Sequence, residues 1–172
     1  MEFVLREMNK FDSVKCKELT VQLGYPEQLI DFDKRFSLIN KLPHHHLVVG
    51  ETLADKNVIA WMHLEIRYLL FSTFRVEISA LIVDEKYRGN GVGRRLLNYA
   101  ENWTKNCGFK EVFLYNQSNI EEENNFCLKN GFQYAKELKM FIKSLDKNHV
   151  ITDVKIPIDT PKIEINLEQI KN

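Results

Sequence analysis

The chain has few of the features that mark secreted, membrane-spanning or disordered proteins. Its 172 residues include only four prolines and three cysteines, and no apolar run approaches the roughly 20 residues of a membrane helix. The cysteines Cys16, Cys107 and Cys127 are widely spaced and form no C-x-x-C pair, which indicates a reducing compartment rather than a disulfide framework. The N-terminus also lacks the apolar stretch of a secretory signal. We therefore expect a cytoplasmic protein with no membrane partner.

The chain also lacks a charge of one sign. It carries 24 Lys plus Arg against 24 Asp plus Glu, so bulk attraction to nucleic acid is excluded. Basic and aromatic residues do not interleave as they do on a nucleic-acid surface, and we expect no nucleic-acid partner. With 44% hydrophobic residues, the chain is long enough and apolar enough to form one globular domain.

Hydrophobic periodicity predicts ten elements in the order β-α-α-β-β-β-α-β-α-β. From residue 144 onward polarity rises, although two stretches in this C-terminal extension (144–172) alternate like strands. An arm that pairs with a sheet edge of another subunit, giving a homodimer, is one interpretation of this extension. The predicted strands are Glu2–Met8, His46–Glu51, Val58–Tyr68, Thr73–Val83, Glu111–Tyr115 and Gln133–Ile142, with Val150–Ile158 and Ile163–Leu167 in the extension; the predicted helices run from Asp12 or Ser13 to Gly24, from about Pro26 to Leu42, and over Gly91–Cys107 and Glu121–Asn130.

Glycine is scarce but clustered. Three of the seven glycines lie between Gly89 and Gly93, at the junction of a predicted strand and a predicted amphipathic helix. Such a turn exposes backbone N–H groups at the positive end of a helix, with no Cβ to hold an anion away. Arg88, Arg94 and Arg95 add positive charge, so the turn predicts a phosphate or pyrophosphate site. The spacing fits neither the dinucleotide fingerprint nor the P-loop.

The segment Arg88-Gly89-Asn90-Gly91-Val92-Gly93 resembles the R/Q-x-x-G-x-G/A signature of the GNAT superfamily of N-acetyltransferases. Ser79–Arg88 is similar to the family's strand leading into this loop. Lys129–Phe132 and Leu23–Pro26 are similar to its closing turn and to a helix junction of small bacterial members. The resemblance covers residues 1–143 and implies an α/β fold in which helices flank a mixed, mostly antiparallel sheet that splays open near residues 81–83.

The resemblance implies an acetyl-CoA-dependent acyltransferase that acts on a primary amine of a small molecule or a protein, with no metal. Its implied cofactor contacts are the pantetheine arm along a strand and the pyrophosphate on the glycine turn. The residues concerned are Ile82, Val83, Arg88, Gly89, Asn90, Gly91, Val92, Gly93, Arg94 and Asn119. The alternative from another class is a CoA-binding module without catalysis.

Acetyl transfer to an amine needs a base for the ammonium, whose pKa is about 10, and an acid for the leaving thiolate. Glu77 lies eleven positions before Arg88, which resembles the location of the family's general base, although a strand Glu paired with Arg75 or Arg67 fits the same pattern. The usual acidic Tyr is replaced by Cys127, for which we favour a structural role. Tyr115, Tyr134 or water are the other sources of the proton.

Two further groups have structural as well as functional interpretations. His44, His45 and His46 have no Cys, Asp or Glu at ligand spacing, so we expect an exposed turn and no zinc site. Trp61, His63 and Glu65 alternate along one predicted strand and either line the acceptor side or form a covered sheet face.

Overall fold

The structure is a computed structural model that describes residues 1–24, 31–116, 121–136 and 138–145. The predicted start of the second helix near Pro26, the cofactor residue Asn119 and the strands predicted in the C-terminal extension lie outside the described residues. No helix in the described part is long and apolar enough to cross a membrane.

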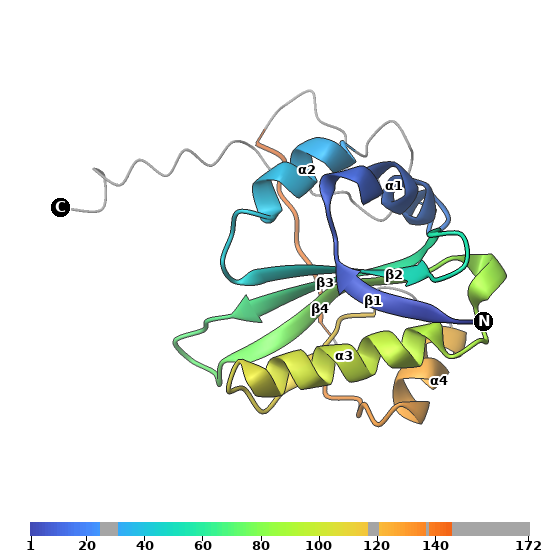
Figure 1. Ribbon diagram of the computed structural model, residues 1–172. Helices are drawn as coiled ribbons and strands as arrows, with labels where there is room; N and C mark the ends of the chain where they lie inside the picture. Colours follow the sequence, from blue (N-terminus) through green and yellow to red (C-terminus); the bar gives the residue numbers. More distant parts are fainter. Residues whose placement is uncertain (25–30, 117–120, 137, 146–172) are drawn as a thin grey trace.

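A five-stranded sheet forms the centre of the fold (Figure 1). All neighbouring strands pair antiparallel except β4 and β5, which are parallel, so the expected mixed, mostly antiparallel sheet is confirmed. In spatial order the strands are β1 (Phe3–Glu7), β2 (His45–Thr52), β3 (Val58–Arg67), β4 (Arg75–Val83) and β5 (Val112–Phe113).

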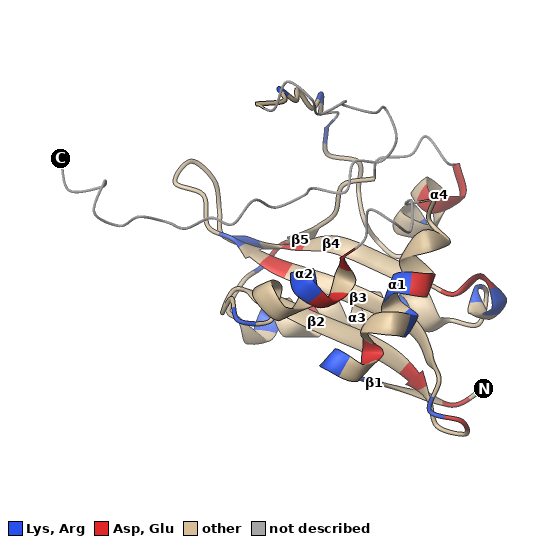
Figure 2. Ribbon diagram, turned by 90° about the horizontal axis from the view of Figure 1, so that it is seen from above, with Lys and Arg blue, Asp and Glu red and all other residues tan. Residues whose placement is uncertain are grey.

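Helices cover both faces of the sheet. Figure 1 shows α1 (Ser13–Val21) and α2 (Phe32–Ile39) on one face and α3 (Val92–Asn106) and α4 (Glu121–Lys129) on the other. Each face has its own apolar core, and the larger one lies under α3. Lys and Arg are interspersed with Asp and Glu along the ribbon (Figure 2), as expected for a chain with no net charge.

A β-bulge at Ser79 divides β4 into two halves. Ile78 pairs with Leu64 and Ala80 with His63, so Ser79 has no partner on β3. The bulge shifts the alternation by one residue: Ile78 belongs to the α3 core, whereas Ala80 belongs to the core under α1 and α2. Unbroken alternation would place Ala80 on the same face as Val76 and Ile78, and the bulge moves it to the opposite face.

The prediction of a strand over Gln133–Ile142 is wrong. Its described residues, 133–136 and 138–142, form no strand, and Met140 and Phe141 are exposed. Alternating hydrophobicity can make a strand only where a neighbouring edge accepts its backbone hydrogen bonds. The last strand of the described sheet, β5, is two residues long and offers little edge for such pairing.

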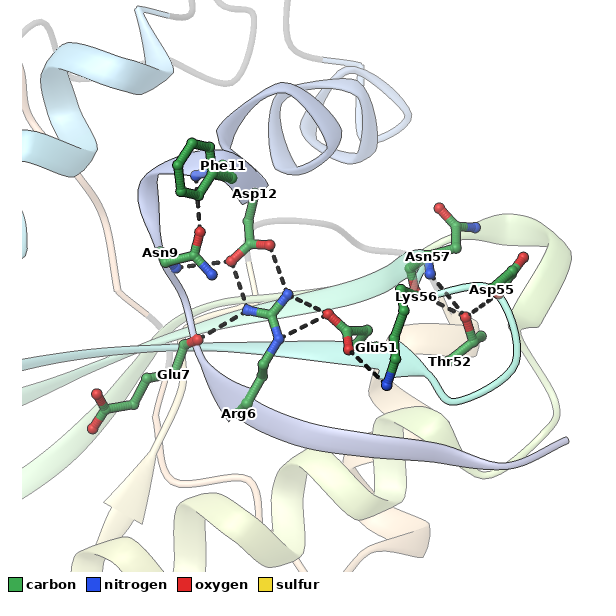
Figure 3. Close-up of polar contacts among 10 residues, drawn as sticks. All are labelled: Arg6, Glu7, Asn9, Phe11, Asp12, Glu51, Thr52, Asp55, Lys56 and Asn57. Carbon is green, nitrogen blue, oxygen red and sulfur yellow. Dashed lines mark hydrogen bonds and ion pairs between the residues drawn. The ribbon is translucent and has the colours of Figure 1, made fainter.

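Arg6 ties three elements together (Figure 3). Its two terminal nitrogens each donate to one carboxylate oxygen of Asp12, both at 2.8 Å, and its Nε donates to Glu51 Oε2 at 2.9 Å. Asp12, only 5% exposed, also accepts from the Asn9 backbone N–H and immediately precedes α1. Burial alone would raise the pKa of Asp12, but these donors hold the pKa below its usual value. The network fixes the start of α1 against β1 and β2.

We expect Arg6→Ala to lower the free energy of unfolding by about 3 kcal/mol, because it leaves the carboxylates of Asp12 and Glu51 without their shared cation. Lys15→Ala is the matched control: it removes an exposed pair with Glu18, which contributes less than about 1 kcal/mol. Urea unfolding measures both variants. An Arg6→Ala loss no larger than the control's would contradict the network's structural role.

Candidate functional site

The glycine turn opens the N-terminus of α3. Gly89 and Gly91 have φ of +77° and +78°, where a side chain would be strained. Gly91 is the N-cap residue, and the first hydrogen bond of the helix runs from the Arg95 N–H to the Gly91 carbonyl at 3.0 Å. The N–H groups of residues 92–94 precede that bond and are therefore available to an anion.

Gly93 has a different role, because its φ is not positive. A Cβ built on Gly93 would lie 3.0 Å from Cζ of Phe126 on α4, which is tighter than most packed contacts and would require the Phe126 ring to shift. The glycine therefore lets α4 pack directly against the start of α3. Side chains also hold the turn, since Asn90 Nδ2 donates to the carbonyls of Tyr87 and Arg88 at 3.3 and 3.2 Å.

The three arginines at the turn are not equivalent. Arg88 folds back toward β4, where its Nε donates to the Val83 carbonyl at 3.2 Å. Arg94 is exposed on the first turn of α3. Arg95 instead donates to the Phe3 carbonyl at 2.9 Å, and its guanidinium lies 4.5 Å from the centre of the Phe3 ring. Arg95 thus secures β1, and of the three arginines Arg88, which is 3.9 Å from Glu85, and Arg94 remain at the turn.

The edge of β4 is open beside this turn. β5 pairs with β4 only at Val76 and Glu77, and no described strand pairs with the edge beyond them. The Asp84 N–H donates to the Ile59 carbonyl at 2.9 Å, so by the alternation of an antiparallel ladder the peptide groups of Ile82 face β3. Those of Leu81 and Val83 face the open edge. At residues 81–83, where the sequence predicts a splay, this edge of β4 therefore has no partner among the described strands.

Leu81 was missed by sequence reasoning, which selected Ile82 and Val83. The bulge at Ser79 determines which peptide groups face outward, and no local pattern in β4 signals the bulge. Val83 lies on the open edge, as the Arg88 hydrogen bond to its carbonyl shows, whereas Ile82 is a buried core residue.

Glu77 lies on the sheet face covered by α1 and α2, one strand away from Glu65, its cross-strand partner. Its side chain is 14% exposed, and its Oε2 is 3.5 Å from Nε of Arg67. Arg67 also contacts Glu65, with 2.8 Å between Nη1 and Oε1. Burial raises the pKa of Glu77, and the Arg67 charge offsets part of that rise. A carboxylate made more basic in this way is suited to accept a proton near neutral pH.

Two histidines, His45 and His63, lie on the same sheet face as Glu65 and Glu77. Trp61, His63 and Glu65 alternate as predicted, and Trp61 packs in the core under α1 and α2. His63 Nε2 lies 2.8 Å from His45 Nδ1. Burial lowers the pKa of His63 to about 4, so this ring is neutral at pH 7. The expectation of an exposed histidine turn is wrong, because His45 and His46 are partly buried in β2.

Of the three candidate acids, Tyr134 follows α4 and is largely exposed, and the other two lie on different elements. Tyr115 follows β5, its ring contacts Phe113 at a centroid distance of 5.3 Å, and it is close enough to Arg67 to affect the pKa of that guanidinium. The side chain of Tyr115 is half exposed. Cys127 lies on α4, and burial raises the pKa of its thiol, which makes it a poorer nucleophile at neutral pH.

Residues 14–132 match the model of the acetyltransferase (GNAT) family. No curated protein matches the chain by sequence. The fold is similar to that of a transcriptional regulator from Bacillus halodurans C-125 (TM-score 0.72, 21% identity, covering 82% of this chain and 100% of that one). It is also similar to glucosamine-6-phosphate N-acetyltransferase from Arabidopsis thaliana (TM-score 0.70, 24% identity, 85% and 100% covered). A third similar structure is AAC(6')-Iy in complex with a CoA bisubstrate analogue (TM-score 0.71, 20% identity, 84% and 99% covered).

We expect Gly91→Ala to weaken CoA binding by about tenfold or more, because strain at positive φ displaces the N–H groups of residues 92–94, which a diphosphate would contact. Gly108→Ala is the matched control. Gly108 has φ of +82° at the other end of α3, so it carries the same backbone strain away from the turn. Calorimetric titration with CoA should show the loss for Gly91→Ala only; equal affinities in the two variants would contradict the assignment of the turn.

Proposed function

The chain belongs to the acetyltransferase (GNAT) family, and on this premise we propose that it transfers the acetyl group of acetyl-CoA directly to a primary amine of a small molecule or a protein. The observation that carries the proposal is the position of the glycine turn at the end of the open β4 edge. The glycine turn offers helix N–H groups to a diphosphate, and the open edge of β4 offers strand peptide groups to an extended chain of amides.

Acetyl-CoA combines these two chemical features. Its diphosphate would lie on the N–H groups of residues 92–94, with Arg88 and Arg94 supplying positive charge. Its pantetheine amides would pair with the Leu81 carbonyl and the peptide groups of Val83 as an added strand. Arg88 would have to share or release the Val83 carbonyl on binding. The thioester then reaches the bulge, next to Glu77.

Glu77 is the proposed general base. An amine reaching the thioester from the α1 and α2 face would meet the Glu77 carboxylate, which accepts the ammonium proton directly or through water. The free amine attacks the thioester carbonyl, and the Leu81 N–H on the open edge is placed to stabilise the oxyanion. The C–S bond then breaks, the thiolate leaves with the electron pair, and the attacking nitrogen releases its extra proton to solvent as the amide forms. Binding both substrates side by side supplies the remaining acceleration.

We infer that Tyr115, rather than Cys127, protonates the leaving thiolate. Glu77 pairs with Phe113, so a residue two positions after Phe113 lies near the place where β4 and β5 separate. The half-exposed phenol of Tyr115 is therefore near this separation, and it is close enough to Arg67 to affect the pKa of that guanidinium. Cys127 lies on α4 and has the structural role of a partly buried helix residue.

The three free cysteines support our proposal of a cytoplasmic enzyme. The proposal of a small-molecule amine as acceptor is supported by two proteins of similar fold, which are named as a glucosamine-6-phosphate N-acetyltransferase and an aminoglycoside N-acetyltransferase. A panel of amino sugars, polyamines, amino acids and peptide amines, monitored by release of the CoA thiol, tests the reaction. CoA binding without thiol release for any amine would favour the non-catalytic module, for which the cysteine at position 127 is the supporting observation.

We expect Glu77→Gln to lower kcat by about 10²- to 10⁴-fold and to leave acetyl-CoA affinity unchanged. In the natural chain kcat should fall as the pH drops through the raised pKa of Glu77, and this acid limb should be absent in the variant. Glu111→Gln, which changes an exposed carboxylate 3.9 Å from Arg75, is the control and should leave kcat within about twofold.

The stability of Glu77→Gln distinguishes lost catalysis from lost folding. Because the pKa of Glu77 is raised in the folded chain, its stability contribution is present at low pH and lost as the pH rises through that pKa. The Gln variant should therefore have an equal or higher Tm at pH 7. A variant that turns over at the natural rate across the pH range would remove Glu77 from the mechanism.

Tyr115→Phe should lower kcat by about 10- to 100-fold, whereas Cys127→Ala should retain it. The Tyr115→Phe defect should shrink with an acetyl thioester of a more acidic thiol, because that leaving group departs without a proton. The opposite pattern, with loss in Cys127→Ala only, would assign the acid to the thiol. Activity retained by Cys127→Ala also excludes an acetyl-cysteine intermediate.

A further inference from the structure

Two histidines and a glutamate converge at the start of β2. The His45 N–H donates to the Leu42 carbonyl at 3.1 Å, closing a β-turn whose second residue is Pro43. This turn brings the His44 ring beside the His45 ring, with 4.4 Å between their centroids. Across the sheet, Glu65 of β3 is the direct partner of His45. One ligand atom from each of His44, His45 and Glu65 lies within 4.8 Å of the other two.

We propose that His44, His45 and Glu65 bind one divalent transition-metal ion of the zinc class. Two imidazole nitrogens and one carboxylate oxygen form a ligand set that Zn²⁺ uses when it keeps a fourth position open. Harder cations such as Mg²⁺ prefer oxygen ligands, so the same set discriminates against them. All three side chains are partly buried, which leaves a path for the ion to enter.

Neighbouring side chains orient two of the three ligands. Nδ1 of His45 is hydrogen-bonded to Nε2 of His63 at 2.8 Å, which leaves Nε2 of His45 as the metal ligand. Arg67 holds one oxygen of Glu65 at 2.8 Å, which leaves the other oxygen for the ion. Metal sites commonly have such outer partners, because they fix the orientation of the ligands.

The charges around the proposed site favour a cation although Arg67 lies beside Glu65. The Arg67 guanidinium is shared between the carboxylates of Glu65 and Glu77, so this group of three carries one negative charge. His44, His45 and His63 face the same group. The prediction of no metal site considered only acidic residues near the histidines in sequence, and the fold supplies Glu65 from the adjacent strand.

The test uses the full-length chain without a histidine tag. Calorimetric titration with Zn²⁺ should give one ion per chain, and Mg²⁺ at the same concentration should give no binding. Bound Co²⁺ should show the intense visible absorption of a four-coordinate site. Glu65→Gln and His45→Asn should each weaken Zn²⁺ binding by at least about 10- to 100-fold, and His63→Gln, which removes an outer partner, by about 10-fold.

His46→Gln is the matched control. His46 lies in the same histidine run but on the opposite face, where it stacks on Trp103 with 5.1 Å between ring centroids. This variant should bind Zn²⁺ as the natural chain does. Absence of Zn²⁺ binding, unchanged affinity in Glu65→Gln, or equal losses in His45→Asn and His46→Gln would overturn the proposal. The readout is metal binding alone, so the result is independent of whether the chain acetylates an amine.

Discussion

The functional architecture depends on one unpaired strand edge. Backbone N–H and C=O groups in a sheet require hydrogen-bond partners, and in the described part of the chain β5 supplies them to β4 only as far as Glu77. Beyond that point the edge can pair with an extended ligand. The chain leaves β4 through a short 3₁₀ helix (η3, Glu85–Tyr87) and enters α3 through the glycine turn, so the helix N-terminus lies at the end of the same edge.

The bulge at Ser79 sets the face on which Glu77 lies and the peptide groups that β4 presents at its open edge. Without it, strict alternation would place Glu77 on the opposite face from Ala80 and would change which peptide groups of residues 80–83 face outward. With it, Glu77 faces α1 and α2 while Leu81 offers its peptide group to the open edge. Burial of Glu77 disfavours its charged form, so the fold loses some stability in keeping a basic carboxylate at this place.

The parts of the fold that sequence could predict are those fixed by local pattern. Leu96, Leu97 and Ala100 recur on one face of α3 and all three are buried under the sheet. Gly89 and Gly91 were predicted to form the turn, and both require positive φ there. These features depend on a few consecutive residues, so their sequence pattern is sufficient to identify them.

The parts that sequence missed depend on pairing between distant segments. Nothing in residues 75–83 signals that Ser79 forms a bulge, because the bulge exists only relative to β3. The alternating segment 133–142 lacks a paired edge in the described structure, and alternation alone could not reveal that. Likewise, the histidine run gained its acidic neighbour, Glu65, through the register of β2 and β3.

The central claim is that an acyl-CoA lies along the β4 edge with its diphosphate on the start of α3. Titrating the ¹⁵N-labelled chain with CoA and following the backbone amide resonances tests this most directly. The account predicts that the largest shifts fall on residues 89–94 together with Leu81 and Val83, while amides of β1 stay unchanged. Saturating CoA that leaves these amides unperturbed, or shifts a different part of the sheet instead, would contradict the account.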